Sequence, residues 1–383
     1  MKANEAKPSF MRWLNNPTIS GRTHPEPLEF QHLRAITVAP KTPHSARLDE
    51  VDEPAADEGS VLVRMLALGV CGTDAEILAG EHGQAPEGTG RLVLGHESLG
   101  RVLEAPEGCG LEVGDLVVGI VRRPDPLPCA ACAGGEWDMC ENGLYTERGI
   151  KAANGFGAER WRADPEAMVR VDPALGLLGV LLEPASVLAK AWDHIERIGG
   201  RTRTWAPTKV LVTGAGPVGL LAALMARQRG HDLHVFDRAT DGPKPALVRD
   251  LGGTYHHGDI ADLAGLEPDI VLECTGAPAV VLAVMQTSGR NGVVCLTGLS
   301  SGGRTLDLDA GGLNRSMVLE NDVVFGSVNA NRAHYEAAAR SLAAADPAWL
   351  GRLISRRVPL ERWSEALERR PGEVKVVIEF AED

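Results

Sequence analysis

Short runs of apolar, often β-branched residues mark the first part of the chain. Residues 33–38, 61–68 and 113–121 form such runs, each bounded by Gly, Pro or acidic residues. This pattern predicts short strands joined by polar turns, and hence an irregular β-rich region. The preceding residues 1–32 are rich in Pro, Asn, Glu and His without clear periodicity. We interpret them as an N-terminal extension with no assigned role.

A helical pattern replaces these runs at residues 183–198. Here Val187, Leu188, Ala191 and Ile195 recur at the spacing of one helix face. We expect a helix that connects the β-rich region to a second unit.

The second unit alternates strands with helices. Apolar runs at residues 209–213, 233–237, 270–273 and 293–296 have the composition of buried strands, and an apolar helix is predicted over 217–229. Such alternation is typical of a parallel sheet with crossover helices.

The C-terminal part contains an alanine-rich stretch near 333–345, which predicts a helix, and a last apolar run, VKVVIEF, at 374–380. We expect this final strand to return to the β-rich region. The prediction is therefore an α/β protein with a β-rich domain over 33–186, completed by 335–383, and a parallel-sheet domain over 187–334.

Length, composition and charge exclude several classes of function. The 383 residues are 44% hydrophobic, enough for two domains with cores. The net charge of −13 argues against nucleic acid as a partner. We expect neither a secretory signal nor a membrane span, because no run approaches about 20 apolar residues. Seven cysteines, an odd number, favour a reducing compartment, and we expect the cytoplasm.

A glycine-rich loop, GAGPVG, lies between the first predicted strand of the second unit and its helix. Gly214, Gly216 and Gly219 have the spacing that dinucleotide-binding loops use for a tight turn, a close approach to pyrophosphate and helix packing. Asp237 ends the next strand, where it would accept hydrogen bonds from the adenosine ribose and repel a 2′-phosphate. This favours NAD, with NADP as the alternative because Arg238 follows and would pair with that phosphate or remain solvated.

A thiol, an imidazole and a carboxylate occur close together in the β-rich region. Cys71 lies in GVCGTD, and His96 and Glu97 lie in LGHESLG. A catalytic zinc takes three such ligands and keeps one position open. A single Cys or His is more often an ordinary buried residue, but the three together predict a zinc site.

With these motifs the chain resembles the medium-chain, zinc-dependent alcohol dehydrogenases, and among them the glucose 1-dehydrogenases. The resemblance covers residues 33–383. It includes VRRP at 121–124, ERGI at 147–150, LLEPASV at 181–187 and SVNANRAHY at 327–335. It implies a GroES-like β-rich catalytic domain and a Rossmann domain with a doubly wound parallel sheet.

The resemblance also implies a ligand set for the catalytic zinc. Cys71, His96 and Glu97 would bind it, with Glu183 as a further carboxylate ligand that also lies at the substrate. Alternatively, Glu97 and Glu183 orient His96 or an arginine without touching the metal, because such outer partners are common.

Sugar contacts are implied at Thr73, Glu147 and Asn329. Thr73 follows the metal cysteine by two positions, which suits a proton relay. Glu147 would grip sugar hydroxyls by charge-assisted hydrogen bonds, or else be a solvated loop carboxylate. Asn329 would bond a hydroxyl or cap the helix that begins near Arg332. Cofactor contacts are expected at Gly214, Gly216, Pro217, Val218, Gly219, Asp237, Arg238, Thr275, Gly276, Leu299 and Asn329.

Three further cysteines resemble the structural zinc lobe of the same superfamily. Cys129, Cys132 and Cys140 supply three of its four ligands, but Pro126 stands where the fourth cysteine is due. Either Asp125 completes a tetrahedral zinc site, which is the interpretation we favour, or the lobe holds no metal and its thiols are protonated.

These predictions converge on one activity: oxidation of an aldose, glucose above all, at its anomeric carbon to the lactone, with zinc and NAD(P). The alternatives are a polyol or secondary-alcohol dehydrogenase, a zinc-ribbon interaction protein, and a non-catalytic dinucleotide sensor. The single CxxC and the acidic charge disfavour the ribbon. The resemblance implies a homodimer or homotetramer joined through the nucleotide sheets.

Overall fold

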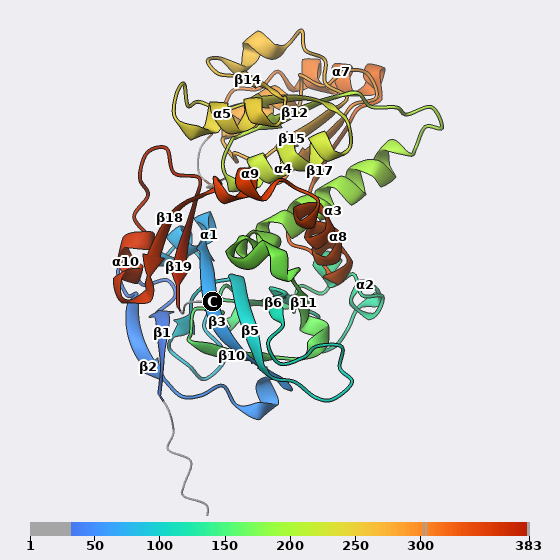
Figure 1. Cartoon of the computed structure of the whole chain (residues 1–383). Coiled ribbons are helices and arrows are strands. Elements are labelled where there is room, and N and C mark those ends of the chain that lie inside the picture. Colours follow the sequence, from blue (N-terminus) through green and yellow to red (C-terminus); the bar gives the residue numbers. More distant parts are fainter. Residues whose placement is uncertain (1–31, 301, 303–304, 381–383) are drawn as a thin grey trace, which may run out of the picture. The chain divides into compact units, whose positions relative to one another are not determined.

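A computed structural model describes residues 32–300, 302 and 305–380 (Figure 1). The predicted N-terminal extension lies outside the described residues except for His32. Within the described part, one hydrophobic core cluster combines side chains of the β-rich region, the central helix and the parallel sheet, among them Leu99, Trp192 and Val212. A second cluster, with Phe156 and Trp161, fills the interior of the β-rich region.

The β-rich region is built around a mixed sheet in the order β11-β6-β5-β3-β19-β18, with β10 pairing with β3 as well. Its strands are β3 (Val61–Val70), β5 (Glu97–Glu104), β6 (Leu116–Gly119), β10 (Arg160–Ala163), β11 (Met168–Arg170), β18 (Ile354–Pro359) and β19 (Lys375–Glu379). Two small sheets, β2-β1-β4 and β7-β8-β9, flank it. They contain β1 (Leu33–Val38), β2 (Arg47–Val51), β4 (Leu92–Val93), β7 (Arg122–Arg123), β8 (Thr146–Arg148) and β9 (Ala152–Ala153).

A parallel sheet in the order β14-β13-β12-β15-β16-β17 forms the second unit. Its strands are β12 (Lys209–Thr213), β13 (Asp232–Phe236), β14 (Thr254–His256), β15 (Ile270–Glu273), β16 (Val293–Leu296) and β17 (Val323–Gly326). The direction of the strand order reverses between β12 and β15. Dinucleotides bind at the carboxyl ends of the strands beside such a reversal.

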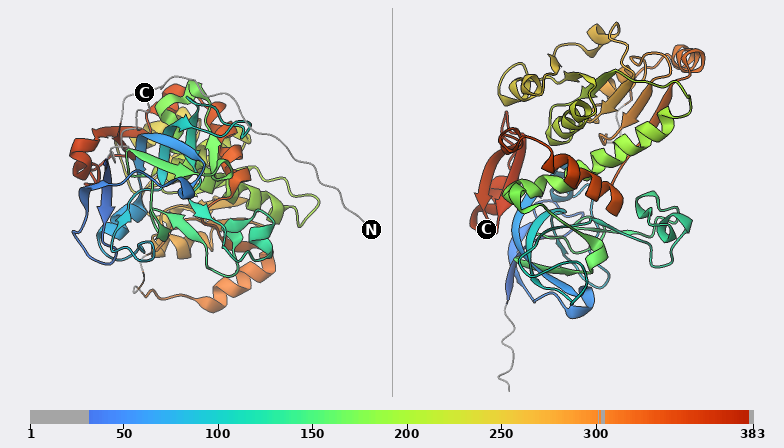
Figure 2. Two further views of the ribbon diagram at one scale, coloured as in Figure 1. Left: turned by 90° about the horizontal axis from the view of Figure 1, so that it is seen from below. Right: turned by 45° about the vertical axis from the view of Figure 1, so that its right-hand side comes forward.

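The longest α-helix of the described residues, α3, joins the two units. It contacts α8 and α4 as well as β5 of one sheet and β16 of the other, and Figure 2 shows it running between them. The helices are α1 (Gly72–Leu78), α2 (Ala130–Ala133), α3 (Leu182–Gly199), α4 (Pro217–Gln228), α5 (Pro243–Asp250), α6 (Pro278–Val284), α7 (Ala310–Glu320), α8 (Arg332–Ala343), α9 (Pro347–Gly351) and α10 (Trp363–Ala366). Short 3-10 helices lie at Ala56–Glu58, Trp137–Met139, Pro165–Ala167, Pro173–Leu181, Ile260–Leu263 and Leu360–Arg362.

Most predicted elements are confirmed. Strands β1, β12, β15 and β16 have the predicted bounds, and α3, α4 and α8 lie within two residues of theirs. The final strand, β19, pairs with β3, so the chain returns to the β-rich region as expected. The domain boundaries at 186/187 and 334/335 stay predictions.

Two predictions need correction. The run at 113–121 is a strand only over Leu116–Gly119, because Gly114 turns with a φ of +95° and Val113 is exposed. The segment Pro173–Gly199 is long and apolar enough to cross a membrane, contrary to our expectation that no such segment exists. However, 72% of its most apolar window is buried inside the protein, where α3 belongs to the core.

Candidate active site

Two neighbouring strands bring the predicted metal ligands together. Cys71 directly follows β3, and His96 directly precedes β5, which Glu97 opens. The strands are antiparallel with Gly69 opposite Glu97, so Cys71 emerges beside the start of β5. One donor atom from each of Cys71, His96 and Glu97 lies within 4.8 Å of the other two. This set of sulfur, nitrogen and oxygen donors suits a zinc ion.

His96 is oriented by a carboxylate that the sequence analysis missed. Asp74, in the same GVCGTD motif, lies on α1, and its Oδ1 is 3.5 Å from Nδ1 of His96. Its Oδ2 accepts a hydrogen bond of 2.8 Å from the backbone N–H of Cys71. Burial alone would lower the pKa of His96, but the Asp74 carboxylate and Cys71 raise it well above its usual value. An imidazole facing a carboxylate on one nitrogen is the usual arrangement of a metal-binding histidine.

Glu97 is paired with a buried lysine, which the sequence analysis also missed. The Nζ of Lys375 on β19 donates to Oε1 and Oε2 of Glu97 at 2.7 and 2.5 Å, and to the Val70 carbonyl at 3.1 Å. Both side chains are buried. The close packing requires glycine at position 69, since a Cβ there would lie 2.0 Å from Oε2 of Glu97. A lysine within the apolar strand VKVVIEF was the available signal.

Glu183 lies in the first turn of α3 and is 9% exposed. Burial raises the pKa of its carboxyl to about 7; His96 opposes this rise, while Glu97 adds to it. Glu183 therefore lies in the electrostatic field of the metal cluster. Its carboxylate is nevertheless outside the group of donor atoms within 4.8 Å of one another. Ligation of the metal by Glu97 and Glu183 stays a prediction.

The predicted sugar contacts Glu147 and Asn329 are brought together from 182 positions apart. Asn329 donates from Nδ2 to Oε1 of Glu147 at 2.8 Å. Arg122, opposite Glu147 on β7, donates to the same oxygen from Nε and Nη2 at 3.1 and 2.9 Å. The Glu147 side chain is only 12% exposed, so the alternative of a solvated loop carboxylate is wrong. Among the described residues, these three hydrogen bonds all end on Oε1, so Oε2 of Glu147 is available as an acceptor.

The alternative in which Asn329 caps α8 is also wrong. The side chain of Asn331, not Asn329, accepts the hydrogen bond from the His334 N–H at the start of that helix. Asn329 instead lies in the left-handed region, with a φ of +63°, and its Oδ1 accepts from the Ala330 N–H at 2.8 Å. Thr73, in the first turn of α1, is half-buried.

The glycine loop has the geometry of a dinucleotide site. Gly214 follows β12 with a φ of +90°, and a Cβ on Gly219 would lie 1.7 Å from the Gly214 carbonyl oxygen. Nothing lies within 4 Å of a Cβ built on Gly216, so this part of the loop is open to a ligand. Pro217 and Val218 form the first turn of α4. The N–H groups there face an anion favourably.

Asp237 follows β13 and is 8% exposed. Its Oδ2 accepts from the Ala215 N–H at 2.7 Å, and its Oδ1 from the Ala239 N–H at 2.9 Å. Burial would raise the pKa of Asp237, but these hydrogen bonds and Lys244 lower it. Lys244 on α5, whose Nζ is 3.3 Å from Oδ2, was not singled out from the sequence. Together with the exposed Arg238, it adds positive charge where a 2′-phosphate would lie.

The predicted contacts after β15 and β16 also meet. Gly276 has a φ of +62°, and a Cβ there would lie 2.0 Å from the Leu299 carbonyl oxygen. The buried carboxylate of Glu273 accepts from the N–H groups of Thr275 at 2.7 Å and Gly276 at 3.1 Å. The loop is thus fixed at the carboxyl end of β15, beside the reversal of the strand order.

The three-cysteine lobe also gathers its thiols. The Sγ atoms of Cys129, Cys132 and Cys140 lie within 4.8 Å of one another. Hydrogen bonds from the backbone N–H groups of Cys132 and Glu141 lower the pKa of Cys129 to about 7, while burial raises that of Cys132 to about 11. The Asp125 carboxylate lies outside this group, although its Oδ2 is buried without a hydrogen-bond partner. A fourth zinc ligand from Asp125 therefore stays a prediction.

Two family profiles cover nearly all the described chain. The Alcohol dehydrogenase GroES-like domain matches residues 57–173, and the Glucose dehydrogenase C-terminus matches residues 176–380. A glucose 1-dehydrogenase of Methanocella arvoryzae is 39% identical over 359 residues, with 91% of this chain and 99% of the relative covered. One from Thermoproteus tenax is 40% identical over 353 residues at the same coverage.

A solved structure agrees with this assignment. Haloferax mediterranei glucose dehydrogenase, in complex with NADP, Zn and gluconolactone, is 32% identical, with 91% of this chain and 100% of that chain covered and a TM-score of 0.85. The fold, the site and these relatives agree, and the chain belongs to the glucose dehydrogenase branch of the zinc-dependent alcohol dehydrogenase superfamily.

Proposed function

We propose that this protein is an NAD(P)-dependent glucose 1-dehydrogenase that oxidises the anomeric carbon of glucose to the lactone. The observation that carries the proposal is the cluster of Cys71, His96 and Glu97, whose donor atoms lie within 4.8 Å of one another. The glucose 1-dehydrogenase relatives and the gluconolactone in the Haloferax complex support the choice of substrate.

The residues of the metal cluster and their neighbours have different proposed roles. Cys71 and His96 would hold zinc, with the carboxylates of Glu97 and Glu183 available beside them. When bound, zinc acts as a Lewis acid on the substrate hydroxyl, and the nicotinamide ring accepts the hydride. Asp74 keeps the His96 ring oriented, and Lys375 balances the Glu97 charge in the buried site. We assign Thr73, which follows Cys71 on α1, as a relay: its hydroxyl oxygen would accept the proton of the substrate hydroxyl while its own proton passes to solvent.

The Glu147–Asn329 pair supplies recognition of the sugar. Arg122 fixes the orientation of the Glu147 carboxylate, so Oε2 would accept a hydrogen bond from a sugar hydroxyl. A buried, charged acceptor discriminates strongly against substrates that lack that hydroxyl, because it would be left unpaired. Simple alcohols would therefore be poor substrates.

For the coenzyme, Asp237 favours NAD, and the nearby cations Arg238 and Lys244 make NADP usable. The Asp237 carboxylate is within reach of the ribose end of the cofactor that the glycine loop would hold. The relative from Haloferax is in complex with NADP. We expect turnover with both coenzymes.

For the assembly, we propose a homodimer or homotetramer joined through the edge of the parallel sheet at β17. This strand ends the sheet, and α7, the helix that precedes it in the chain, exposes Val318 and Leu319 by 67% and 65%. An exposed strand edge with apolar neighbours favours pairing with a second copy. Light scattering after gel filtration tests this assembly, and a monomeric protein would contradict it.

We also propose a cytoplasmic location, which suits the seven free thiols.

The activity is tested by following reduced nicotinamide on a panel of glucose, galactose, xylose, sorbitol and simple secondary alcohols, with NAD and with NADP. We expect glucose to give the highest kcat/KM and a chelator to abolish turnover. Equal kcat/KM values for glucose and a simple alcohol would overturn the sugar assignment. Full activity after complete removal of zinc would overturn the metal assignment.

A further inference from the structure

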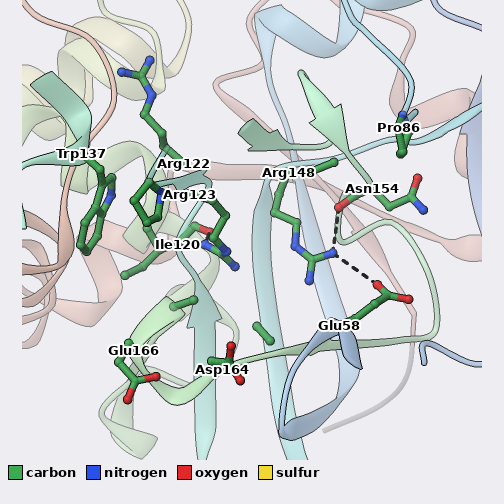
Figure 3. Close-up of a pocket in the computed structure, with 14 residues that line it drawn as sticks. Glu58, Pro86, Ile120, Arg122, Arg123, Trp137, Arg148, Asn154, Asp164 and Glu166 are labelled. Atoms are coloured by element: carbon green, nitrogen blue, oxygen red, sulfur yellow. Dashed lines mark hydrogen bonds and ion pairs between the residues drawn. The ribbon is translucent and has the colours of Figure 1, made fainter. Parts of the chain in front are cut away.

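A cavity of about 620 Å³ lies in the β-rich region, apart from the residues assigned above to zinc and coenzyme (Figure 3). Its volume is in the range of small-molecule sites. The cavity is lined by the loop and strands around β7, β8 and β10, with an apolar wall that includes Ile120 and Trp137. Of the residues discussed so far, Arg122 lines it on the side of Glu147.

Two further arginines, Arg123 and Arg148, line this cavity, and of these two only Arg148 has an ion pair among the described residues, a long one. Arg123 on β7 donates from Nη1 to the Ile120 carbonyl, but its Nη2 is buried and has no hydrogen-bond partner. The Asp164 carboxylate favours the charged form of Arg123 from a distance, but among the described residues Arg123 forms no ion pair with a carboxylate within 4.0 Å.

Arg148 on β8 is in a similar position and is only 8% exposed. Its guanidinium donates to the carbonyl oxygens of Asn154 at 3.0 Å and of Arg162. Its recorded ion pair is with Oε2 of Glu58 at the long distance of 4.0 Å. Figure 3 shows the contacts of Arg148 with Asn154 and Glu58, with Arg123 on the other side of the cavity.

The two guanidinium groups also repel each other. Burial, and next the Arg148 charge, lower the pKa of Arg123 to about 9, and burial lowers that of Arg148. A guanidinium N–H that is buried without a hydrogen-bond partner, as at Nη2 of Arg123, is costly, and the like charge of Arg148 adds to that cost. An anion between them would remove both the repulsion and the unpaired donor.

The other charged groups that line the cavity are carboxylates, which accept hydrogen bonds. Asp164 and Glu166 are exposed and line the cavity together with Glu58. Asp164 is already held by the N–H of Ser60 at 3.2 Å. Carboxylates in this position would accept hydrogen bonds from hydroxyl groups of a ligand, while they would repel a ligand that is anionic throughout.

We propose that this cavity is a second binding site, for a small oxyanion carried on a hydroxylated body, with the carboxylate or phosphate held by Arg123 and Arg148. Guanidinium groups bind both kinds of oxyanion through paired N–H donors. The site does not depend on the proposed dehydrogenase activity. Arg123 lies on β7, and Arg148 lies on β8, the strand that also carries Glu147. A ligand in this cavity would therefore lie next to the strand pair that positions the proposed sugar contact.

The test is isothermal titration calorimetry on the full-length, zinc-loaded protein saturated with NAD, at constant ionic strength. The probes are gluconate, glucose 6-phosphate and inorganic phosphate, with sorbitol as the neutral control. We expect gluconate or glucose 6-phosphate to bind and sorbitol not to bind. Binding of inorganic phosphate alone would identify a free oxyanion, rather than a hydroxylated ligand, as the occupant and would overturn that part of the proposal.

Two variants locate the binding. Arg123→Gln and Arg148→Gln should each weaken the affinity by about tenfold or more, because each removes a charge-assisted contact. Arg203→Gln, at an exposed position outside the cavity, is the matched control and should bind as the unchanged protein does. Circular dichroism checks folding, and if Arg148→Gln does not fold, Arg123→Gln decides alone. Absence of binding in the unchanged protein, or unchanged affinity in Arg123→Gln, would overturn the proposal.

Discussion

Replacing Lys375 by methionine removes the cation that faces Glu97 in the metal site. The two side chains are 2% and 1% exposed, and both carboxylate oxygens accept hydrogen bonds from Nζ. Methionine has a similar length, so little volume is lost and the main change is electrostatic. The Glu97 carboxylate would then be buried without a counter-charge.

The expected loss of folding stability is about 3 to 5 kcal/mol, the usual cost of removing one partner from a buried ion pair. It is measured by urea unfolding of the chelator-treated protein. Lys41→Met, at an exposed position, is the control and should change stability by less than about 0.5 kcal/mol.

A double-mutant cycle separates the pair from its surroundings. The combination Lys375→Met with Glu97→Gln should be more stable than the sum of the single losses predicts, by about 2 kcal/mol, because the unpaired charge is gone. If the single variant loses less than about 1 kcal/mol, or if the cycle is additive, the reasoning about the buried pair is refuted. Repeating the cycle with zinc bound shows whether Glu97 is a ligand, since zinc would then compensate the missing lysine.

Four further results are expected. Cys71→Ser should abolish zinc-dependent turnover but change the coenzyme Kd by less than about twofold, measured by nicotinamide fluorescence, because the two sites use different units of the fold; a large loss of coenzyme affinity would contradict this. Glu147→Gln and Asn329→Ala should each lower kcat/KM for glucose by about 10²-fold or more, with a much smaller effect on a simple secondary alcohol; equal losses for both substrates would indicate a merely structural role. Lys244→Met should raise KM for NADP by about tenfold and leave KM for NAD nearly unchanged, because the cation beside Asp237 would attract the 2′-phosphate that NAD lacks. In chelator-treated protein, the pKa of the Glu183 carboxyl is raised to about 7, against 4.5 for the free side chain. Its contribution to the free energy of unfolding is therefore complete below pH 4.5 and is lost as the pH rises through 7. Glu183→Gln should flatten the fall of the urea midpoint with pH over this range, and an unchanged slope of the midpoint against pH would contradict the shift.

The features that local sequence can specify were predicted well. The GAGPVG loop, with a strand before it and a helix after it, lies at the end of β12 as expected. Cys71 and His96 were found because each stands at a strand end within a short motif. In both cases the relevant geometry is set by neighbours in the sequence.

What local sequence could not specify are partners from distant segments. Lys375 is 278 positions from Glu97, and only the pairing of β19 with β3 brings them together. That Asn331 and not Asn329 caps α8 likewise depends on backbone angles, since either asparagine suits a helix start. The pairing of Arg122 with Glu147 required the register of β7 with β8.

The central claim is that Cys71, His96 and the neighbouring carboxylates hold a zinc ion that glucose oxidation requires. The most direct measurement is the zinc content of the purified protein, by elemental analysis, together with its rate of glucose oxidation as zinc is removed and restored. To isolate the catalytic site, the same titration is run on Cys71→Ser. We predict that activity follows the occupancy of one zinc site that is missing in Cys71→Ser. Undiminished glucose oxidation in the zinc-free protein, or an unchanged zinc content and activity in Cys71→Ser, would contradict the account.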